Sequence, residues 1–372
     1  MKLPIPKEEQ FRAPAHHERV TSKIGLALAI TFTTCFVTGL ISHLIQHPPA
    51  WFWWPSRPAG LYRVTQGLHV ICGVASVPLL LAKLWSVYPK LFGRPLVRSL
   101  PHALERLSIL VLSGAAFFEL TTGLLNVAQN YPWGFYFPQV HYAVAWLAIG
   151  SILVHVAVKL PVIRRALTRT TTAGEPPAEG LSRRGFLVTT GLATGVAVVA
   201  TAGATVPFLR GVSGLSWKTG KGTQNLPVNR TAAAAGITWS PSWRLSVVSP
   251  RGTTMFSLDE LRALPQTSAE LPIACVEGWS QSATWRGISL PTLLKAVGAA
   301  PGTAIRVSSS ERGGLYGVSV LPGEHTADEL TLLALELNGE VLAPDHGFPC
   351  RIIAPNRPGV LQTKWVTKLE VL

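Results

Sequence analysis

The sequence is poor in charged residues and in cysteine. Charged residues make up 14% of the 372 positions, whereas a typical soluble protein has about 25%, and hydrophobic residues make up 48%. This composition excludes an enzyme that is soluble along its whole length. The four cysteines are too few and too scattered for a disulfide framework or a CxxC zinc site.

Acidic residues are scarce in the first part of the chain. Residues 1–216 contain 19 lysines and arginines but only 7 aspartates and glutamates, whereas residues 217–372 contain 14 and 12. The formal net charge of +14 therefore arises in the hydrophobic part. A positive excess there indicates membrane topology and not nucleic-acid binding.

Five apolar runs are long enough to cross a membrane, which takes roughly 20 helical residues. They lie at 24–45, 64–85, 107–127, 140–160 and 186–209. We therefore predict an N-terminal all-α transmembrane bundle of five helices.

The loop charges predict the orientation. Of the 19 basic residues before position 217, only Arg57, Arg63 and Arg210 would lie outside. The positive-inside rule then places the N-terminus in the cytoplasm, and five crossings make the C-terminal domain extracytoplasmic. The outer connections 46–60 and 130–138 are rich in Trp, Tyr and Phe, as membrane interfaces are.

The fifth run is rich in Gly, Ala, Val and Thr, and residues 182–187 before it read SRRGFL. This resembles a twin-arginine export signal placed inside the chain, which implies a folded, cofactor-loaded domain and the twin-arginine export machinery as a partner. The alternative is two cytoplasmic arginines that obey the positive-inside rule. Residues 168–180 are predicted to form a flexible linker. We expect a four-helix domain at 1–170, the linker and fifth helix at 171–216, and an outer domain at 217–372.

Three histidines occupy matching depths in the bundle. His141 and His155 are 14 residues apart, which places them on one helix face about 21 Å apart along the axis. That spacing can offer one axial imidazole to each of two stacked haems. His69 lies near the outer end of the second span, and Gly73 one turn later would leave room for a macrocycle.

With these histidines the bundle resembles the cytochrome b subunits of formate dehydrogenases and hydrogenases. The resemblance implies an outer haem b held by His69 and His141, and an inner haem served by His155. The second axial ligand of the inner haem is left open: it is Lys83 or His102, or the inner haem site is absent. The alternative is that these histidines are hydrogen-bonding residues of helix packing.

Glu119 is the one carboxylate deep in the predicted bundle, and such residues usually face its interior. Either proton handling for a quinol or a structural pairing with Thr, Asn or Lys would explain it. His43 and His47, at the outer end of the first span, are interpreted as interfacial.

From residue 217 the pattern changes to short β-type runs broken by Gly, Pro and Ser. Strands are expected at 243–248, 304–308, 317–321, 350–354 and 366–371, with helices at 258–263 and 290–297. The fold expected for these 156 residues is α+β and β-rich.

Two stretches of this domain carry its chemistry. Residues 271–280 read LPIACVEGWS, and residues 335–351 read LELNGEVLAPDHGFPCR, with GVLQTKW following at 359–365. In this order they resemble the molybdopterin-binding domain of the sulfite oxidase family, over most of 224–372. The resemblance implies a molybdenum cofactor and an oxygen-atom-transferring oxidoreductase.

By this resemblance Cys275 is the thiolate ligand of molybdenum, since such a centre needs one more soft anionic ligand. The cofactor's phosphate requires cationic and N–H donors. Around the cofactor the resemblance places Asn229, Arg230, Thr231, His346, Arg351, Gln362, Thr363 and Lys364. One of Ser308, Ser309 or Ser310 is a further candidate contact. The alternative for Cys275 is an inert buried thiol, which is the interpretation for Cys350.

One departure concerns the substrate. Sulfite oxidases carry an arginine five residues after the ligand cysteine, and here that position is Ser280. CVEGWS is closer to the catalytic subunit of periplasmic methionine sulfoxide reductases, although Arg230 could still serve an anionic substrate as a catalytic residue.

Together the two halves predict a membrane-anchored molybdenum oxidoreductase that exchanges electrons with a quinone pool through haem b. The reductive direction is hypothesised. The alternatives are a haem-free anchored enzyme with a separate electron carrier and a metal-free binding module.

Overall fold

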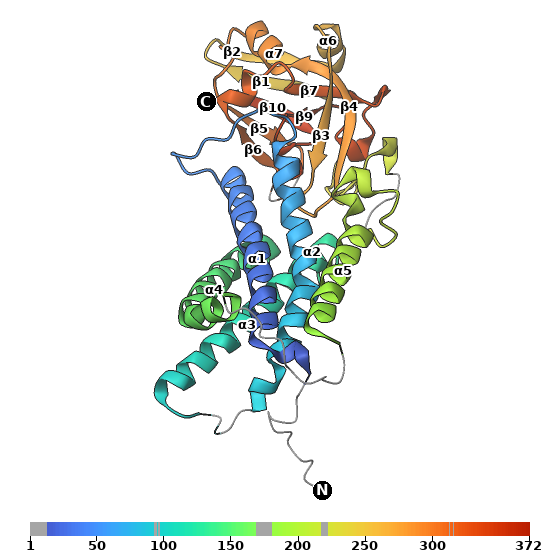
Figure 1. Cartoon of the computed structure of the whole chain (residues 1–372). Coiled ribbons are helices and arrows are strands. Elements are labelled where there is room, and N and C mark those ends of the chain that lie inside the picture. Colours follow the sequence, from blue (N-terminus) through green and yellow to red (C-terminus); the bar gives the residue numbers. More distant parts are fainter. Residues whose placement is uncertain are drawn as a thin grey trace. The chain divides into compact units, whose positions relative to one another are not determined.

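The computed structural model describes residues 13–92, 95, 97–168, 181–216, 222–311, 313–314 and 316–372 (Figure 1). The chain divides into two compact units. The first consists of Met1–Leu40, Leu68–Gly203 and Leu209–Trp217. The second consists of Ile41–Gly67, Ala204–Phe208 and Lys218–Leu372.

Five long helices confirm the prediction of an apolar helical region. They are α1 (Glu18–Gln46), α2 (Leu61–Val87), α3 (Leu100–Val127), α4 (Phe137–Thr168) and α5 (Arg183–Thr201). All five are long and apolar enough to cross a membrane. The first four extend beyond the predicted runs because polar residues at their ends continue the helical hydrogen bonding.

The fifth helix begins and ends for local reasons. Ser182 is its N-cap and accepts a hydrogen bond from the Gly185 backbone N–H, so the serine of the SRR motif starts the helix. The regular helix ends at Thr201, before the predicted limit of 209, and short 3-10 turns follow at Ala202–Ala204 and Pro207–Leu209. Pro207 cannot donate a backbone hydrogen bond, which favours this early end. The predicted linker beyond Thr168 falls outside the described residues.

The structure confirms the predicted β-rich domain, which consists of two five-stranded sheets. The first has the order β2-β1-β10-β5-β6, in which only β1 and β10 pair in parallel. The second has the order β3-β4-β7-β8, with β9 also paired to β7. The strands are β1 (Leu245–Ser249), β2 (Gly252–Phe256), β3 (Thr267–Ala274), β4 (Ser280–Ser289), β5 (Ile305–Ser309), β6 (Val318–Leu321), β7 (Leu332–Leu337), β8 (Glu340–Val341), β9 (Arg351–Ile353) and β10 (Val366–Val371).

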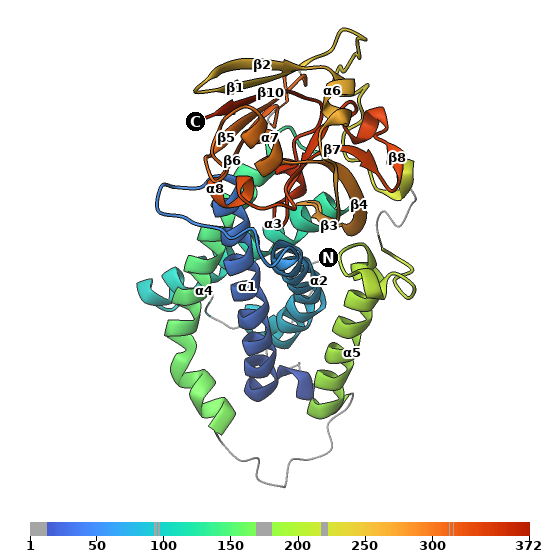
Figure 2. The ribbon, with the colours of Figure 1, turned by 90° about the horizontal axis from the view of Figure 1, so that it is seen from above.

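Two hydrophobic clusters flank the second sheet, which Figure 2 shows together with the first. Strand β7 contributes to both because its side chains alternate: Leu333 and Leu335 face one cluster, whereas Leu332 and Ala334 face the other. The cluster between the sheets also receives the short helix α7 (Leu290–Ala296). The other cluster contains Cys275 and thereby positions the candidate site.

The connection between α1 and α2 belongs to the same compact unit as the β-rich domain. Asn356, a buried residue with a φ of 56°, binds it through four hydrogen bonds. Its backbone N–H donates to the Ala59 carbonyl (3.1 Å) and its Nδ2 to the Pro55 carbonyl (2.6 Å). Its carbonyl accepts from Trp54 Nε1 (2.9 Å), and its Oδ1 accepts from the Tyr62 N–H (2.6 Å) in the first turn of α2.

A bidentate ion pair strengthens this attachment. Arg57 donates through Nε and Nη2 to both carboxylate oxygens of Asp328, at 2.8 and 2.9 Å. The guanidinium lowers the pKa of the Asp328 carboxyl against the opposing effect of burial. The connection is therefore an integral part of the second unit.

Candidate functional site

The thiol of Cys275 lies where strand β3 ends. Its backbone N–H donates to the Trp279 carbonyl (2.8 Å), and the Gly278 N–H donates back to the Cys275 carbonyl (3.0 Å). This tight loop needs a left-handed residue, and Gly278 supplies it with a φ of 88°. Cys275 is only 2% exposed. We call residues 275–280 the cysteine loop.

Hydrogen-bond donors converge on the Cys275 sulfur. Asn229 Nδ2 donates to Sγ at 2.7 Å, and the Glu277 backbone N–H donates at 3.4 Å. The Asn229 Oδ1 in turn accepts from Trp279 Nε1 (2.8 Å), which fixes the amide. Donors of this kind stabilise a thiolate and orient a metal ligand.

Cys350 provides a contrast within the same domain. Its thiol lies in the apolar core between the sheets, and its Sγ donates only to the Val366 carbonyl at 3.6 Å. Burial raises the pKa of this thiol well above its usual range. Neither cysteine forms a disulfide within the described part of the chain, and the two sulfurs have different surroundings.

Two cations, the buried Arg351 and the half-buried Lys364, form a second part of the site. Arg351 donates from Nη1 to the His346 carbonyl and from Nη2 to the Gln362 carbonyl, both at 3.1 Å. Its guanidinium lies 5.0 Å from the centre of the Trp285 ring, and its buried Nε has no partner. Burial lowers the pKa of Arg351 to about 9.

Lys364 donates from Nζ to the carbonyls of Arg230 (2.6 Å) and Asp345 (2.9 Å). Burial, followed by the charge of Arg351, lowers the pKa of Lys364 to about 7. Within the described part of the chain, neither cation forms an ion pair with a carboxylate. Two such cations, together with the Arg351 Nε–H that has no hydrogen-bond partner, could bind an anion such as a phosphate.

Residues 229–231 join the two ends. Asn229 contacts the sulfur, and the carbonyl of the next residue, Arg230, accepts from Lys364. The Arg230 guanidinium forms an ion pair with Glu311 (2.8 Å), and Thr231 Oγ1 accepts from the Ala234 N–H (3.2 Å). The structure thus links a soft thiol to a cationic end through one short segment.

The two remaining cofactor-binding candidates, Gln362 and Thr363, use their side chains within the protein. Gln362 makes a pair of hydrogen bonds with the Ala354 backbone, at 2.7 and 2.8 Å. Thr363 Oγ1 lies 2.7 Å from Ser319 Oγ. Among the three candidate serines, Ser309 donates to the Lys364 carbonyl (2.7 Å). These groups position the backbone beside the cations.

Gly347 allows the two cations to approach one another. Its φ is 108°, and an added Cβ would lie 3.1 Å from the Cβ atoms of both Arg351 and Lys364. We expect Gly347→Ala to lower the free energy of unfolding by about 1–3 kcal/mol more than the same change at an uncrowded glycine, because the new Cβ would crowd these two Cβ atoms in addition to straining the backbone. Chemical denaturation checks this, with Gly302→Ala as the control, since that glycine also has a positive φ but open space around it. Equal effects of the two changes would contradict a steric role for Gly347.

The burial of His346 is expected to make the stability of the domain depend on pH. Its Nε2 lies 2.6 Å from the Thr223 carbonyl, and burial lowers its pKa from 6.5 to about 4. Between these two pKa values the unfolded chain binds more protons at this residue than the folded chain does. The free energy of unfolding therefore falls by about 3 kcal/mol as the pH falls from about 6.5 to about 4. Denaturation of cofactor-free protein at several pH values measures this loss. His346→Gln should reduce it, whereas an unchanged profile would contradict the assignment.

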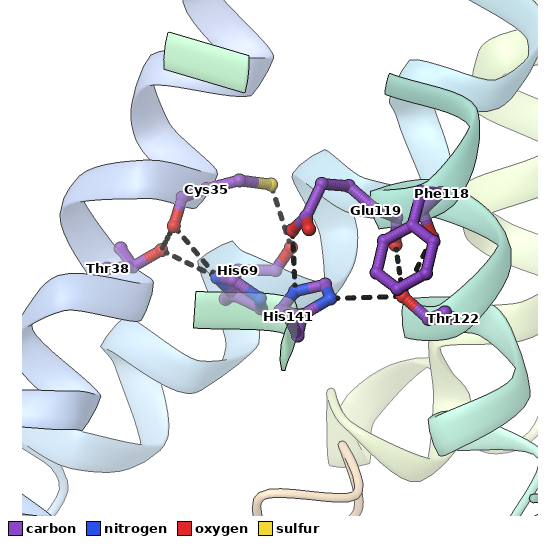
Figure 3. A network of polar contacts seen from close by, with 7 residues as sticks. All are labelled: Cys35, Thr38, His69, Phe118, Glu119, Thr122 and His141. Carbon is purple, nitrogen blue, oxygen red and sulfur yellow. Dashed lines mark hydrogen bonds and ion pairs between the residues drawn. The ribbon is translucent and has the colours of Figure 1, made fainter. Parts of the chain in front are cut away.

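A second cluster lies in the helical unit and involves His69 on α2 and His141 on α4. Their ring centres are 6.4 Å apart (Figure 3). His69 Nδ1 lies 2.9 Å from the Cys35 carbonyl and 3.2 Å from Thr38 Oγ1. His141 Nδ1 lies 3.1 Å from Thr122 Oγ1. Each ring is therefore held through Nδ1, the arrangement typical of imidazoles that bind metal through Nε2.

The spacing of the rings suits a shared metal ion. Two metal–nitrogen bonds of about 2 Å separate ring centres by roughly 6 Å. Glycines lie beside both rings: a Cβ at Gly39 would be 3.1 Å from His69 Cε1, and one at Gly123 would be 3.7 Å from His141 Cε1. Glu119 Oε2 lies 3.1 Å from His141 Nε2, so the structure pairs this carboxylate with a histidine.

The inner candidates do not form a comparable pair. Lys83 Nζ donates to the Thr21 carbonyl (2.9 Å), and His102 Nδ1 accepts from the Arg98 backbone N–H (3.2 Å). Among the described residues His155 has no histidine ring contact. His43 and His47 contact each other, with ring centres 4.9 Å apart. Nowhere in the described ranges do three or more His, Cys, Asp or Glu side chains form a metal-type group.

Sequence reasoning missed several supporting residues. Trp285 stood in a motif stretch, but its contact with the Arg351 guanidinium and its strand β4 were not predicted. Gln66 and Thr205, which contact the cysteine loop, lie in apolar surroundings that gave no signal. The positive φ of Asn356 is a common property of asparagine, but its partners are remote in sequence.

Comparison with known proteins identifies the class of the second unit. Residues 232–372 match the family model described as "Oxidoreductase molybdopterin binding domain". They form a molybdopterin-binding oxidoreductase domain that is similar to the sulfite oxidases. This confirms the family that the motifs around Cys275 and His346 indicated.

Individual relatives agree with this class. An oxidoreductase of Bacillus subtilis, YuiH, is 27% identical over 40% of this chain and 74% of its own length. The sulfite oxidase of Arabidopsis thaliana is 28% identical over 31% of this chain and 38% of its own. A protein named protein-methionine-sulfoxide reductase subunit YedZ1, of Azospira oryzae, is 30% identical over 31% and 43%. The chain thus spans less than half the length of the latter two relatives.

A solved structure, the sulfane dehydrogenase SoxCD of Paracoccus pantotrophus, covers 39% of this chain and 44% of its own, with 20% identity. The TM-score is 0.33, which is too low to support an argument about the fold.

Proposed function

We propose that the protein is a membrane-anchored molybdenum-cofactor oxidoreductase that transfers oxygen atoms on the outer face of the membrane. The observation that carries this proposal is the Cys275 sulfur, which accepts from Asn229 and is joined through Arg230 to the cation Lys364. A pterin cofactor with a metal at one end and a phosphate at the other requires this pair of environments.

The residues have separate roles in the proposed site. Cys275 would hold the molybdenum, while Asn229 and the Glu277 N–H stabilise the thiolate charge. Arg351 and Lys364 would bind the phosphate, and His346, whose carbonyl accepts from Arg351, would hold that guanidinium in place. When bound, the cofactor supplies two-electron oxygen-atom chemistry.

We propose that His69 and His141 hold one haem b in the helical unit. The 6.4 Å ring spacing and the two Nδ1 contacts support this assignment. Glu119, beside His141, would lie at the haem and not at a separate site. His155 stays a candidate for an inner haem, and a quinone pool is the proposed electron source.

The orientation proposal rests on the basic residues. Their concentration in the N-terminal tail and in the connections α2–α3 and α4–α5 supports a cytoplasmic location for those segments and an outer location for the β-rich domain. The SRR motif at the start of α5 supports export by the twin-arginine machinery, which transports folded domains.

For the substrate we propose an S-oxide, which two electrons and two protons convert to a thioether and water. Ser280 and the CVEGWS loop support this direction. Sulfite-type oxidation of an anion is a second candidate, because Arg63 donates from Nε to Ser280 Oγ at 2.8 Å. A guanidinium from α2 thus contacts the residue five positions after Cys275. Arg230 suits this role less, since it is paired with Glu311.

Analysis of the purified full chain in detergent tests the proposal. We expect about one molybdenum per chain, a dithionite-reduced haem b absorption band, and quinol-dependent reduction of S-oxides. Sulfite oxidation in place of S-oxide reduction would select the second candidate. A chain purified from cells that make molybdopterin but containing no molybdenum would contradict the proposed function, and absence of the band would contradict the haem.

A further inference from the structure

Three side chains, two from the first turns of α2 and one from the segment that follows α5, contact the cysteine loop. Gln66 Nε2 donates to the Val276 carbonyl (3.4 Å), and Thr205 Oγ1 donates to the Gly278 carbonyl. Arg63 Nε donates to Ser280 Oγ (2.8 Å). Gln66 and Thr205 are 8% and 4% exposed. All these residues belong to the second compact unit.

Apolar contacts connect the same segments. Ala204, next to Thr205, lies in the hydrophobic cluster that contains Cys275 and Trp279. Tyr62, one turn before Gln66, packs in a cluster with Ala274, the residue before Cys275. The cysteine loop is therefore enclosed by residues from two helices that sequence and composition assign to the membrane region.

The segment that contains Asn356 also packs against the backbone of Cys275. The turn that follows it places Gly359 so close to the loop that an added Cβ would lie 3.6 Å from the Cys275 Cα and 3.4 Å from the Ala274 carbonyl. Asn356 binds the α1–α2 connection through four hydrogen bonds. That connection therefore also holds in place the turn at Gly359 that packs against the Cys275 backbone.

We propose that the first turns of α2 and the segment that follows α5 are parts of the molybdenum centre, in which Gln66 and Thr205 act as positioning residues that fix the backbone of the cysteine loop. This inference rests on the proposed role of Cys275 as the molybdenum ligand. The two hydrogen bonds hold carbonyls one and three residues after the ligand, and so they set the direction in which its sulfur points. The anchor thereby shapes the catalytic domain in addition to retaining it at the membrane.

The test compares the double variant Gln66→Leu/Thr205→Val with a matched control, Gln46→Leu/Thr65→Val. The control removes the same groups, but Gln46 Nε2 donates to the Ser42 carbonyl and Thr65 Oγ1 to the Tyr62 carbonyl, each within its own helix. Full-chain protein is purified for all variants, and wild-type molybdenum content is measured first.

Two readouts report the position of the ligand. In loaded enzyme we expect a changed Mo(V) electron paramagnetic resonance spectrum and a kcat lower by about tenfold with little change in KM, the size typical for lost outer contacts of a metal ligand. In cofactor-free protein we expect alkylation of Cys275 to be faster by about tenfold, since the loop opens more often after it loses hydrogen bonds. Thr205→Ser keeps the hydroxyl and should match the wild type.

The inference is overturned if the double variant shows the wild-type spectrum, kcat and alkylation rate, or if the control changes them equally. Loss of molybdenum from a folded double variant supports it, because the loop then needs these contacts to retain the metal. If the double variant does not fold, the single variant Thr205→Val, which conserves the shape of the side chain, is tested instead. The same three measurements, the Mo(V) spectrum, kcat and the alkylation rate, then decide the question. A wild-type chain without molybdenum would instead contradict the proposed function.

Discussion

The Cys275→Ser variant should lose at least a hundredfold in oxygen-atom transfer while keeping its fold and its haem absorption. Loss of an outer partner of a metal ligand costs about 10- to 100-fold, so loss of the ligand itself should cost more. A serine hydroxyl can still accept from Asn229, which is why the loop should keep its structure. Steady-state assays together with molybdenum analysis and the reduced absorption spectrum measure these effects.

Cys350→Ser is the matched control for this experiment. It makes the same chemical change in the same domain, but at a thiol buried in the core between the sheets. We expect it to lower stability because a hydroxyl enters an apolar environment, and to leave the activity per folded molecule unchanged. Full activity of Cys275→Ser, or equal losses in the two variants, would refute the assignment of the ligand.

The variants His69→Ala and His141→Ala should each abolish the haem b band and with it quinol-dependent turnover. A haem between two imidazoles loses half of its axial ligation when either is removed. Turnover with an artificial reductant that acts directly on the molybdenum site should persist. The reduced-minus-oxidised spectrum and the two assays separate loss of haem from loss of the catalytic domain.

The control is His47→Ala, which removes a histidine of the same bundle whose ring contacts only His43 among the described ring pairs. This variant should keep the band. A full band in His69→Ala would show that the pair does not bind haem, and loss of the band in His47→Ala would point to a different pair.

Much of the fold followed from the hydrophobic pattern. The five spans were predictable because an apolar run of that length has few other solutions. In the β-rich domain, β10 was predicted at 366–371 and α6 at 258–263, as found for Val366–Val371 and Leu258–Ala263. Ser257 forms a capping box with Glu260, a local signal that marks the start of α6.

Other strands were missed for physical reasons. Strand β4 runs from Ser280 to Ser289 and contains many polar residues, because alternate side chains face solvent and its neighbours β3 and β7 decide its register. Strand β2 is mostly exposed and is held by its pairing with β1. Pairing between remote segments leaves little trace in a local pattern.

The site divides in the same way. Cys275, Arg351 and Lys364 stood in motifs whose order was informative, so their chemistry could be predicted. The contacts of Gln66 and Thr205 could not, because each depends on where a remote helix end meets the cysteine loop. The pairing of Glu119 with His141 likewise needed the packing of α3 against α4.

The attachment of the α1–α2 connection to Asn356 constrains how many times the chain can cross a bilayer. The Tyr62 backbone N–H and the Asn356 side chain are 2.6 Å apart, so under the proposed topology both must lie on the same side of the membrane. Four helices, α2 to α5, separate the connection from the β-rich domain. An even number of traversals returns the polypeptide to the side it left, whereas adding or deleting one would put roughly 30 Å of hydrocarbon between the two partners. The contacts of Asn356 therefore require an even number of membrane crossings between the α1–α2 connection and the β-rich domain.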